Sequence, residues 1–406
     1  MKNCFKKRKL LGCAGALLAT LLMLGGCASA DMPPLPEHPG ETEQQAPDNI
    51  GTLYEQSNVV MTGGRNLVNL PGIVLYTSQE DVGMHLSYAN KSTGNAGVYC
   101  FDPLCNHSSC AVWRFTELSD IAYSPTDGQL YGSSTTEDVE SDGNLWRIDT
   151  QTQKVTQVYR GNGNPFKQLF AYGPYIYFTS YNQKGEWFCS RYHVEQGKTE
   201  QLSLPSSWNF RFVYPAGAYL MVTSASNNSV VYLCNDDFTE WKEVSLPTPT
   251  FTYSLVAGTV LYGGDYGEDT PAEYANANCS RLLAFDMLSG EVQIIYDDDT
   301  PKRVMAFDGA YLYYSQGEWS QKDSYFVGSM FGNLKRVSVN DAADNKQVEN
   351  VFDVNDYKGI SSVQMAAIFE GTLYLRVKTS DLDYPLCRMT QDEEGKWQLH
   401  RYEILW

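Results

Sequence analysis

Three signatures of common enzyme classes are absent from this sequence of 406 residues. It contains no GxSxG motif, no HExxH motif and no GxxxxGK[ST] loop. The sequence therefore offers no local basis for a serine-hydrolase elbow, a zinc-protease helix or a P-loop nucleotide site. A convincing long helical pattern is also missing, which argues against a helical or mixed α/β fold.

Histidine and basic residues are scarce. The chain has five histidines, and we interpret His85, His193 and His400 as surface or blade residues rather than general bases. Lys and Arg number 30 against 48 Asp and Glu, for a net charge of −18. A field of that sign repels phosphate backbones, so a nucleic-acid partner is not expected.

The N-terminus lacks an apolar run long enough to span a bilayer comfortably. Five basic residues precede an apolar run over residues 10–24, which is the layout of a secretory signal peptide. The run leads into Leu24-Gly25-Gly26-Cys27, which resembles a bacterial lipobox. We therefore predict a signal peptide over residues 1–26 and acylation of Cys27, for example with palmitate. This anchor would hold the mature chain on the extracytoplasmic face of the cell membrane.

The segment that follows Cys27 has almost no apolar residue to bury. Residues 28–50 carry five prolines among acidic residues and glutamines. Because such a composition cannot offset the entropy cost of ordering, we predict a disordered, Pro-rich tether over residues 27–50. Cleavage of the signal peptide removes five basic residues, which leaves 25 Lys and Arg against 48 acidic residues, or −23.

The rest of the chain shows the pattern of an all-β protein. From about residue 66 the sequence alternates apolar and polar residues, is rich in Tyr and Val, and has turn residues every eight to twelve positions. One phrase, a small or turn residue followed by an apolar-aromatic pair, recurs seven times: PGIVLYTS (71–78), DGQLYGSS (127–134), GPYIYFTS (173–180), AGAYLMVTS (216–224), AGTVLYGG (257–264), DGAYLYYS (308–315) and EGTLYLRV (370–377).

The spacing of these phrases predicts a β-propeller. Successive copies lie 41 to 61 residues apart, which suits a blade of four short antiparallel strands with the phrase as its second strand. We therefore predict one propeller domain over residues 51–406, with seven four-stranded blades. Six or eight blades are the alternatives, since residues 56–64 can add a strand that closes the ring on the last blade.

Several of these features together resemble a known group of proteins. The lipobox, the tether, the seven phrases and the stretch CFDPLCNHSSC (100–110) are similar to uncharacterised propeller-like lipoproteins of clostridia and related gut bacteria. The resemblance covers essentially the whole mature chain and implies the fold and the location, but no activity. The stretch AFDMLSGEVQIIY (284–296) is similar, more loosely, to TolB-type and quinoprotein-type propellers.

The stretch from 100 to 110 contains four metal-ligand side chains, Cys100, Cys105, His107 and Cys110. They can form a closed tetrahedral Cys3His set around one structural zinc ion. Alternatively, two of the cysteines form a disulfide, as an extracytoplasmic location permits. A third interpretation is a reactive thiol with His107 as its base. The sequence leaves these three alternatives open, and it implies no other cofactor.

The remaining cysteines of the mature chain have a simpler interpretation. Cys189, Cys234, Cys279 and Cys387 fall in or beside predicted third strands of different blades. A lone buried cysteine behaves there as a small hydrophobe. We therefore expect these four to be core residues.

Two long insertions between second and third strands are candidate binding loops, residues 263–278 and residues 317–333. The second insertion carries the four aromatic residues of a candidate platform for a glycan or peptide: Trp319, Tyr325, Phe326 and Phe331. These rings can instead pack the loop onto its own blade. The acidic stretch YDDDTP (296–301) offers oxygen ligands for calcium, but we interpret it as a solvated turn because the twelve-residue loop pattern is missing.

These features favour a non-enzymatic function. We predict a surface-anchored bacterial lipoprotein whose propeller binds a ligand or a partner, namely a glycan, a peptide or an envelope protein. The alternative is an extracytoplasmic hydrolase or lyase that acts on carbohydrate through carboxylates at the propeller mouth. Two convergent acids in the central pocket would identify the enzyme, because a glycosidase needs such a pair.

Overall fold

The computed structural model describes the greater part of the chain beyond residue 58, in the following ranges: 59–60, 67–80, 83–100, 121–133, 143–161, 166–182, 184–224, 227–265, 279–322, 325–330, 332–341, 346–381, 384–402 and 404–405. The predicted signal peptide, the tether and Cys27 lie outside these ranges. Within them, no helix is both long and apolar enough to cross a membrane.

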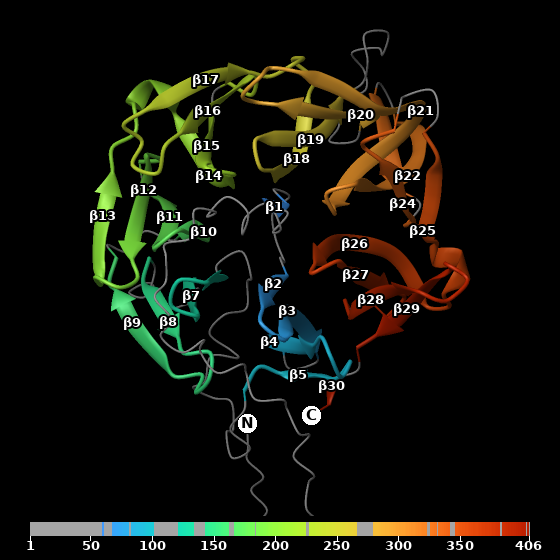
Figure 1. Ribbon diagram of the computed structural model, residues 1–406, viewed down its shortest axis with the longest axis horizontal. Helices are drawn as coiled ribbons and strands as arrows, with labels where there is room; N and C mark the ends of the chain where they lie inside the picture. The colour runs from blue at the N-terminus through green and yellow to red at the C-terminus, as the bar shows by residue number, and fades with distance from the viewer. Residues whose placement is uncertain are drawn as a thin grey trace, which may run out of the picture. The chain divides into compact units, whose positions relative to one another are not determined.

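The described residues fold as an all-β protein, and their strands form a β-propeller (Figure 1). Five sheets each contain one four-stranded antiparallel meander, or blade. The first blade consists of β2 (Val68–Leu70), β3 (Ile73–Glu80), β4 (Gly83–Asn90) and β5 (Ala96–Val98). The second consists of β6 (Ile121–Ser124), β7 (Gln129–Ser133), β8 (Leu145–Ile148) and β9 (Val155–Tyr159).

The other three separate blades repeat this pattern. One contains β10 (Phe166–Tyr172), β11 (Tyr175–Tyr181), β12 (Trp187–His193) and β13 (Lys198–Leu202). The next contains β14 (Phe210–Ala216), β15 (Tyr219–Ser224), β16 (Val230–Cys234) and β17 (Trp241–Ser245). The last contains β26 (Ile360–Phe369), β27 (Thr372–Thr379), β28 (Leu386–Gln391) and β29 (Trp397–Arg401). The prediction of a propeller is therefore confirmed.

A nine-stranded sheet lies between the β14–β17 and β26–β29 blades. Its members are β1 (Val59–Val60), β18 (Thr252–Ala257), β19 (Val260–Asp265), β20 (Cys279–Asp286), β21 (Val292–Phe307), β22 (Tyr311–Lys322), β23 (Tyr325–Met330), β24 (Leu334–Ser338) and β25 (Val348–Phe352). β21 is 16 residues long and pairs with β20 through its first part and with β22 through its second. The predicted count of seven blades stays a prediction, because this sheet is continuous.

The seven recurring phrases form the second strands, as predicted. Each central apolar residue is fully or almost fully buried, from Leu75 at 0% exposure to Leu373 at 3%. The glycine before each strand adopts a positive φ, for example 75° at Gly72 and 76° at Gly371. That conformation costs glycine little, so the turn between the first two strands can be tight. The phrase therefore encodes a turn and a buried strand together.

Apolar clusters join neighbouring blades and close the ring. One cluster contains Leu70 of the first blade, Leu130 of the second and Phe369 of the last. Burial of such side chains is the main favourable contribution to folding. The C-terminal strand β30 (Ile404–Leu405) also adds to the first blade, where it pairs in parallel with β5. The last described strand, β30, is therefore the outermost strand of the first blade.

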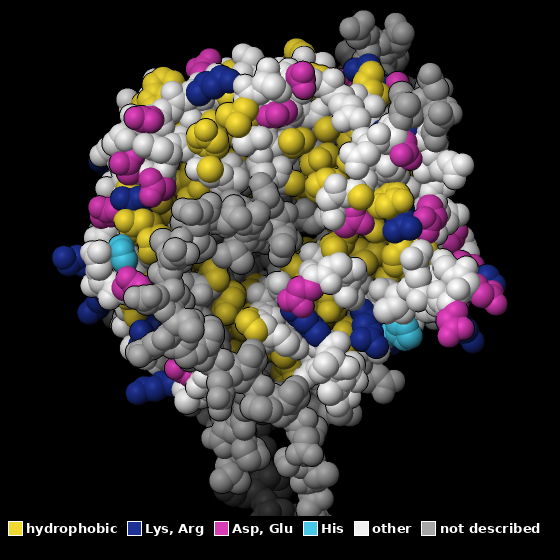
Figure 2. Space-filling view, in the orientation of Figure 1, with side chains coloured by type: hydrophobic (Ala, Val, Ile, Leu, Met, Phe, Trp, Pro, Cys, Tyr) yellow, Lys and Arg dark blue, Asp and Glu magenta, His cyan; other side chains and the backbone are white. Residues whose placement is uncertain are grey.

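The expectation that residues 56–64 close the ring on the last blade is wrong. Within that segment β1 pairs with β18, the first strand of the nine-stranded sheet, and β30 supplies the closing strand instead. Figure 2 shows the described side chains on one face. Hydrophobic groups gather toward the inner parts of the blades there, and charged groups of both signs are interspersed toward the outer edge.

Candidate functional site

Each blade presents two rims with different connections. The link between second and third strands leaves one end of the blade, which we call the 2–3 rim. The 1–2 and 3–4 turns leave the other end, which we call the 3–4 rim. In the nine-stranded sheet, Asp265 ends β19 and Cys279 begins β20 at the 2–3 rim, and Cys279 lies opposite Lys302 of β21. Lys302 in turn lies opposite Gln316 of β22, so both predicted insertions leave the same rim.

Charged side chains that are buried or partly buried gather at this part of the 2–3 rim. They are Asp265, Arg281, Asp298 and Lys302, which we call the rim charge cluster. Arg281 donates from Nε and Nη2 to the two carboxylate oxygens of Asp265, both at 2.7 Å. The Asp265 side chain is only 1% exposed, so this fork is almost dry. A bidentate pair of this kind fixes the relative position of β19 and β20.

Lys302 is the most buried cation of the cluster, with a side chain that is 0% exposed. Its Nζ donates to the Asp298 carboxylate and to the carbonyl oxygens of Ser280 (2.5 Å), Asp298 (3.0 Å) and Thr300 (2.9 Å). Burial lowers the pKa of this ammonium, and the Asp298 carboxylate acts in the opposite direction. The ammonium is therefore enclosed by oxygen acceptors rather than offered to solvent.

Asp298 is held in its ionised form by the same contacts. Partial burial acts to raise the pKa of its carboxyl, but hydrogen bonds from Lys302 and Thr300 outweigh burial and lower that pKa. Thr300 also accepts a hydrogen bond from Gln316 Nε2 at 2.7 Å, which links the cluster to β22. The acidic stretch 296–301 therefore lies within β21 and binds an internal lysine, and its interpretation as a solvated turn is wrong.

The predicted loop over residues 317–333 is for the most part a β-hairpin. β22 continues to Lys322 and pairs with β23, with Trp319 opposite Gly328 and Phe326 opposite Gln321. Tyr325 begins β23, and Phe331 lies outside the described residues. The hairpin extends the second strand beyond the rest of the sheet at the 2–3 rim. Whether its aromatic residues form a platform stays a prediction.

Only one member of the cysteine and histidine cluster lies in the described part of the chain. Cys100 is half-buried and lies just after β5. Cys105, His107 and Cys110 lie outside the described residues, so zinc, disulfide and reactive thiol stay alternatives. In the ranges given above, no group of three or more His, Cys, Asp and Glu side chains is placed to hold a metal ion.

The prediction for the other four cysteines is confirmed. Cys189, Cys234, Cys279 and Cys387 lie in the third strands β12, β16, β20 and β28, and all are buried. Burial raises the pKa of the Cys234, Cys279 and Cys387 thiols to about 12, and it also raises the pKa of the Cys189 thiol. These thiols are core groups rather than nucleophiles.

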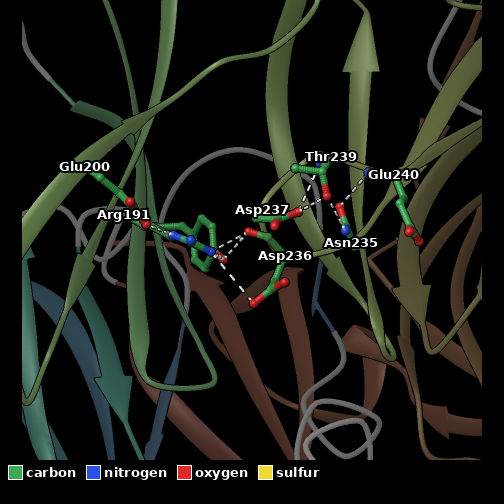
Figure 3. Close-up of polar contacts among 8 residues, drawn as sticks. Arg191, Glu200, Asn235, Asp236, Asp237, Thr239 and Glu240 are labelled. Atoms are coloured by element: carbon green, nitrogen blue, oxygen red, sulfur yellow. Dashed lines mark hydrogen bonds and ion pairs between the residues drawn. The ribbon is translucent and has the colours of Figure 1, made fainter.

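A second polar arrangement lies at the 3–4 rim, between the β10–β13 and β14–β17 blades (Figure 3). Arg191 of β12 pairs with Glu200 of β13 and reaches across to the next blade, where Nη1 donates to the Asp236 carbonyl at 2.8 Å. Tyr177 donates from its hydroxyl to the same carbonyl at 2.7 Å. The neighbouring turn is held by Asp237, which accepts from Thr239. This arrangement joins two blades.

Similar bonds join other neighbours around the 3–4 rim. Lys242 Nζ donates to the Leu288 carbonyl at 3.0 Å, and Gln293 Nε2 donates to the Val339 carbonyl at 2.8 Å. Both bonds span 46 residues, and the Arg191 bond spans 45, so each joins one repeat to the next. Sequence reasoning missed these residues. The only signal for these bonds in the sequence was the recurrence of a long polar side chain at about the spacing of the repeat.

The carboxyl groups also bear on the choice between binder and enzyme. Four Asp carboxyls of the described residues have a pKa below the ordinary value: Asp149, Asp237, Asp298 and Asp392. A glycosidase that protonates its leaving group needs one carboxyl with a raised pKa. These four groups do not have that property.

No protein-family model and no curated protein matches the chain in sequence. Among solved structures, the chain is similar to an acylaminoacyl peptidase in complex with Z-Gly-Gly-Phe-chloromethyl ketone. The TM-score is 0.52 at 14% identity, and the match covers 86% of this chain and 53% of that chain. The uncomplexed acylaminoacyl peptidase of Pyrococcus horikoshii has a TM-score of 0.51 at 13% identity, with the same coverage.

A putative TolB from Agrobacterium tumefaciens is also similar, with a TM-score of 0.39 at 11% identity. That match covers 58% of this chain and 81% of that chain. The chain spans about half the length of the two peptidases. At such low identities, the likeness to the two peptidases supports the fold alone.

Proposed function

We propose that this protein is a lipid-anchored, extracytoplasmic β-propeller of seven blades that binds a ligand or a partner through its 2–3 rim. The observation that carries the binding proposal is the geometry of the nine-stranded sheet. Two adjacent connections, the one between Asp265 and Cys279 and the β22–β23 hairpin, leave the same rim above the rim charge cluster. Rigid scaffolds commonly bind through such extended connections.

The seven-blade count is supported by the strand order within the nine-stranded sheet. β18, β19, β20 and the first part of β21 follow one antiparallel meander, and the second part of β21 continues into β22, β24 and β25. Two blades that share one continuous strand account for this order. Together with the five separate blades they give seven, which is also the number of recurring phrases.

The pairing of charges in the rim charge cluster supports the proposal that this cluster holds the strands beneath the binding surface in place. Arg281 and Lys302 are neutralised by Asp265 and Asp298, so they hold strand ends in place rather than attract a charged ligand. A well-positioned rim lowers the entropy cost of binding, because less of the surface must be ordered when the ligand arrives.

The membrane anchor is tested by replacing Cys27 with Ser. We expect the full chain to incorporate an alkyne-labelled palmitate analogue and to sediment with membranes in a bacterial host. The C27S variant should lose both properties, and the matched C13S variant should keep them. Loss of the label in C13S alone would assign the anchor to Cys13 and would contradict the proposal.

The binding surface is tested by shortening the hairpin. A variant in which residues 319–328 are replaced by an Asn-Gly turn, which joins the opposed residues Glu318 and Ser329, is compared with wild type for retention by a panel of immobilised polysaccharides and peptidoglycan. We expect the variant to lose at least tenfold in affinity for any probe that wild type retains. A matched variant at the opposite rim, Glu393→Ala, should bind as wild type does. Equal loss in both variants would contradict a site at the 2–3 rim.

The same probes distinguish the alternative function. If the protein is a carbohydrate-active enzyme, incubation with a retained polysaccharide should release reducing ends or unsaturated sugars over time. A binder should leave the polysaccharide at its original length.

A further inference from the structure

The first strand of the nine-stranded sheet differs from the first strands of the five separate blades. In the described part of the chain, β2, β6, β10, β14 and β26 each end their sheet, whereas β18 carries a further strand on its inner edge. That strand is β1, with Val59 opposite Val256 and Val60 opposite Leu255. Figure 1 shows β1 in the middle of the ring beside β18.

The edge that β1 covers is well suited to main-chain pairing. Leu255 and Val256 are 0% and 2% exposed, so β18 is firmly fixed in the blade. An edge strand presents a row of backbone N–H and C=O groups that pair readily with another extended segment. The sequence of β18, TYSLVA, has no charged residue, so nothing along it would repel an apolar strand.

β1, the strand that now covers the edge of β18, should be easy to displace. β1 contains two residues, and so short a pairing makes few hydrogen bonds. Its two valines favour the extended conformation, and the surrounding segment, QSNVVMTGG (56–64), carries no charge. The chain's own segment therefore has the chemistry of a modest ligand for this edge.

We propose that the inner edge of β18 is a strand-addition site for an extended, uncharged, β-branched peptide of a partner protein, and that residues 59–60 occupy it in the free protein. A partner segment longer than β1 makes more main-chain bonds along Thr252–Ala257 and displaces it. This site is separate from the 2–3 rim surface of the proposed function. Its partner must compete with an intramolecular strand, which keeps the edge covered when the partner is absent.

The test uses the full chain with β1 disabled, in the variant Val59→Pro, Val60→Pro. Proline lacks the N–H that a ladder requires. The probe is a fluorescent peptide of residues 56–64 measured by anisotropy. We expect the variant to bind the peptide at least tenfold more tightly than wild type, whose own strand covers the edge. A peptide with the same two prolines should bind to neither protein.

Hydrogen exchange supplies a second readout. Amides of residues 252–257 should exchange faster in the variant and regain protection when the peptide is added, while those of β27 should not change. If the proline variant does not give a cooperative melting transition, Val60→Gly takes its place, because glycine keeps the N–H and only weakens the strand. A folded variant that binds no peptide, or a wild type that binds equally well, would overturn the proposal.

Discussion

Arg191 and Arg336 occupy equivalent positions in two antiparallel meanders. The Arg191 guanidinium carbon lies 4.1 Å from the Tyr175 ring centroid, and that of Arg336 lies 4.3 Å from the Tyr311 ring centroid. Each arginine lies on a third strand and pairs with a glutamate of the fourth. The repeat therefore reproduces a polar unit as well as a strand pattern.

Replacement of Arg191 by Met should lower the free energy of unfolding by about 1–3 kcal/mol, because the Asp236 carbonyl loses a charged donor. The measurement is urea unfolding followed by tryptophan fluorescence. Lys396→Met is the matched control, since its partner Glu394 is 74% exposed. The control should change the free energy by about 0.5 kcal/mol or less. Equal losses in both variants would contradict a structural role for Arg191.

Removal of Asp298 should be more harmful than removal of Lys302. Asp298→Ala leaves an ammonium that is 0% exposed without its counterion, for which we expect a loss of about 3–5 kcal/mol. Lys302→Met leaves a carboxylate that is 28% exposed and can take up water, so its cost should be smaller. The double variant should resemble Lys302→Met. Strict additivity of the two losses would show that the pair is not coupled.

The stability difference between wild type and Asp298→Asn should depend on pH. The pKa of Asp298 is lowered in the folded protein from its ordinary value of 3.8, so its ionised form stabilises the fold. This contribution is fully present above the ordinary value and is lost as the pH falls through the lower folded value. We therefore expect the difference in free energy of unfolding to be constant from pH 5 to 7 and to shrink below about pH 4. If the difference in free energy of unfolding grew as the pH fell, the protonated form of Asp298, rather than the ionised form, would stabilise the fold.

The four buried thiols should resist alkylation. Iodoacetamide at pH 8 is expected to modify Cys189, Cys234, Cys279 and Cys387 at least tenfold more slowly in native protein than in guanidinium, because burial keeps the thiols protonated. Peptide mass spectrometry reports each site separately. Rapid native modification of Cys279 would show that the 2–3 rim opens in solution.

Ring closure by β30 can be tested with Ile404→Pro. Ile404 lies opposite Ala96 in the parallel pair, and proline would remove its N–H from that pair. We expect faster hydrogen exchange in residues 96–98 and a loss of about 1 kcal/mol in the free energy of unfolding. Unchanged exchange in β5 would mean that the pairing does not hold the first blade closed.

The fold was predictable where a local signal existed. The seven second strands, from residue 73 to residue 379, combine a turn glycine with a run of consecutive buried residues, and the glycine and the apolar residues are visible in sequence. The four core cysteines were predictable for the same reason. The pairing of β1 with β18 was not, because nearly 200 residues separate Val59 from Val256 and no local signal specifies a partner strand.

The polar sites were harder to predict because they use backbone acceptors. Lys302 is bound by three carbonyl oxygens, and Arg191 reaches the carbonyl of Asp236. Every residue has a carbonyl, so such sites leave no motif. The acidic stretch 296–301 resembled a turn because it combines three aspartates with a proline. Lys302 follows it directly, but no sequence signal shows that this lysine is buried against Asp298.

β21 has a mechanical consequence for the sheet to which it belongs. Because it is one strand from Val292 to Phe307, no loop separates the two meanders on either side of it, although its pairing with β20 shifts register between Asp297 and Lys302. A load applied to the β22–β23 hairpin would pass along this strand into β20 instead of being absorbed by a loop. A break in the chain between β17 and β18 should disturb the fold less than a break within β21. The two meanders that share β21 would therefore be duplicated, lost or exchanged together when the sequence is rearranged.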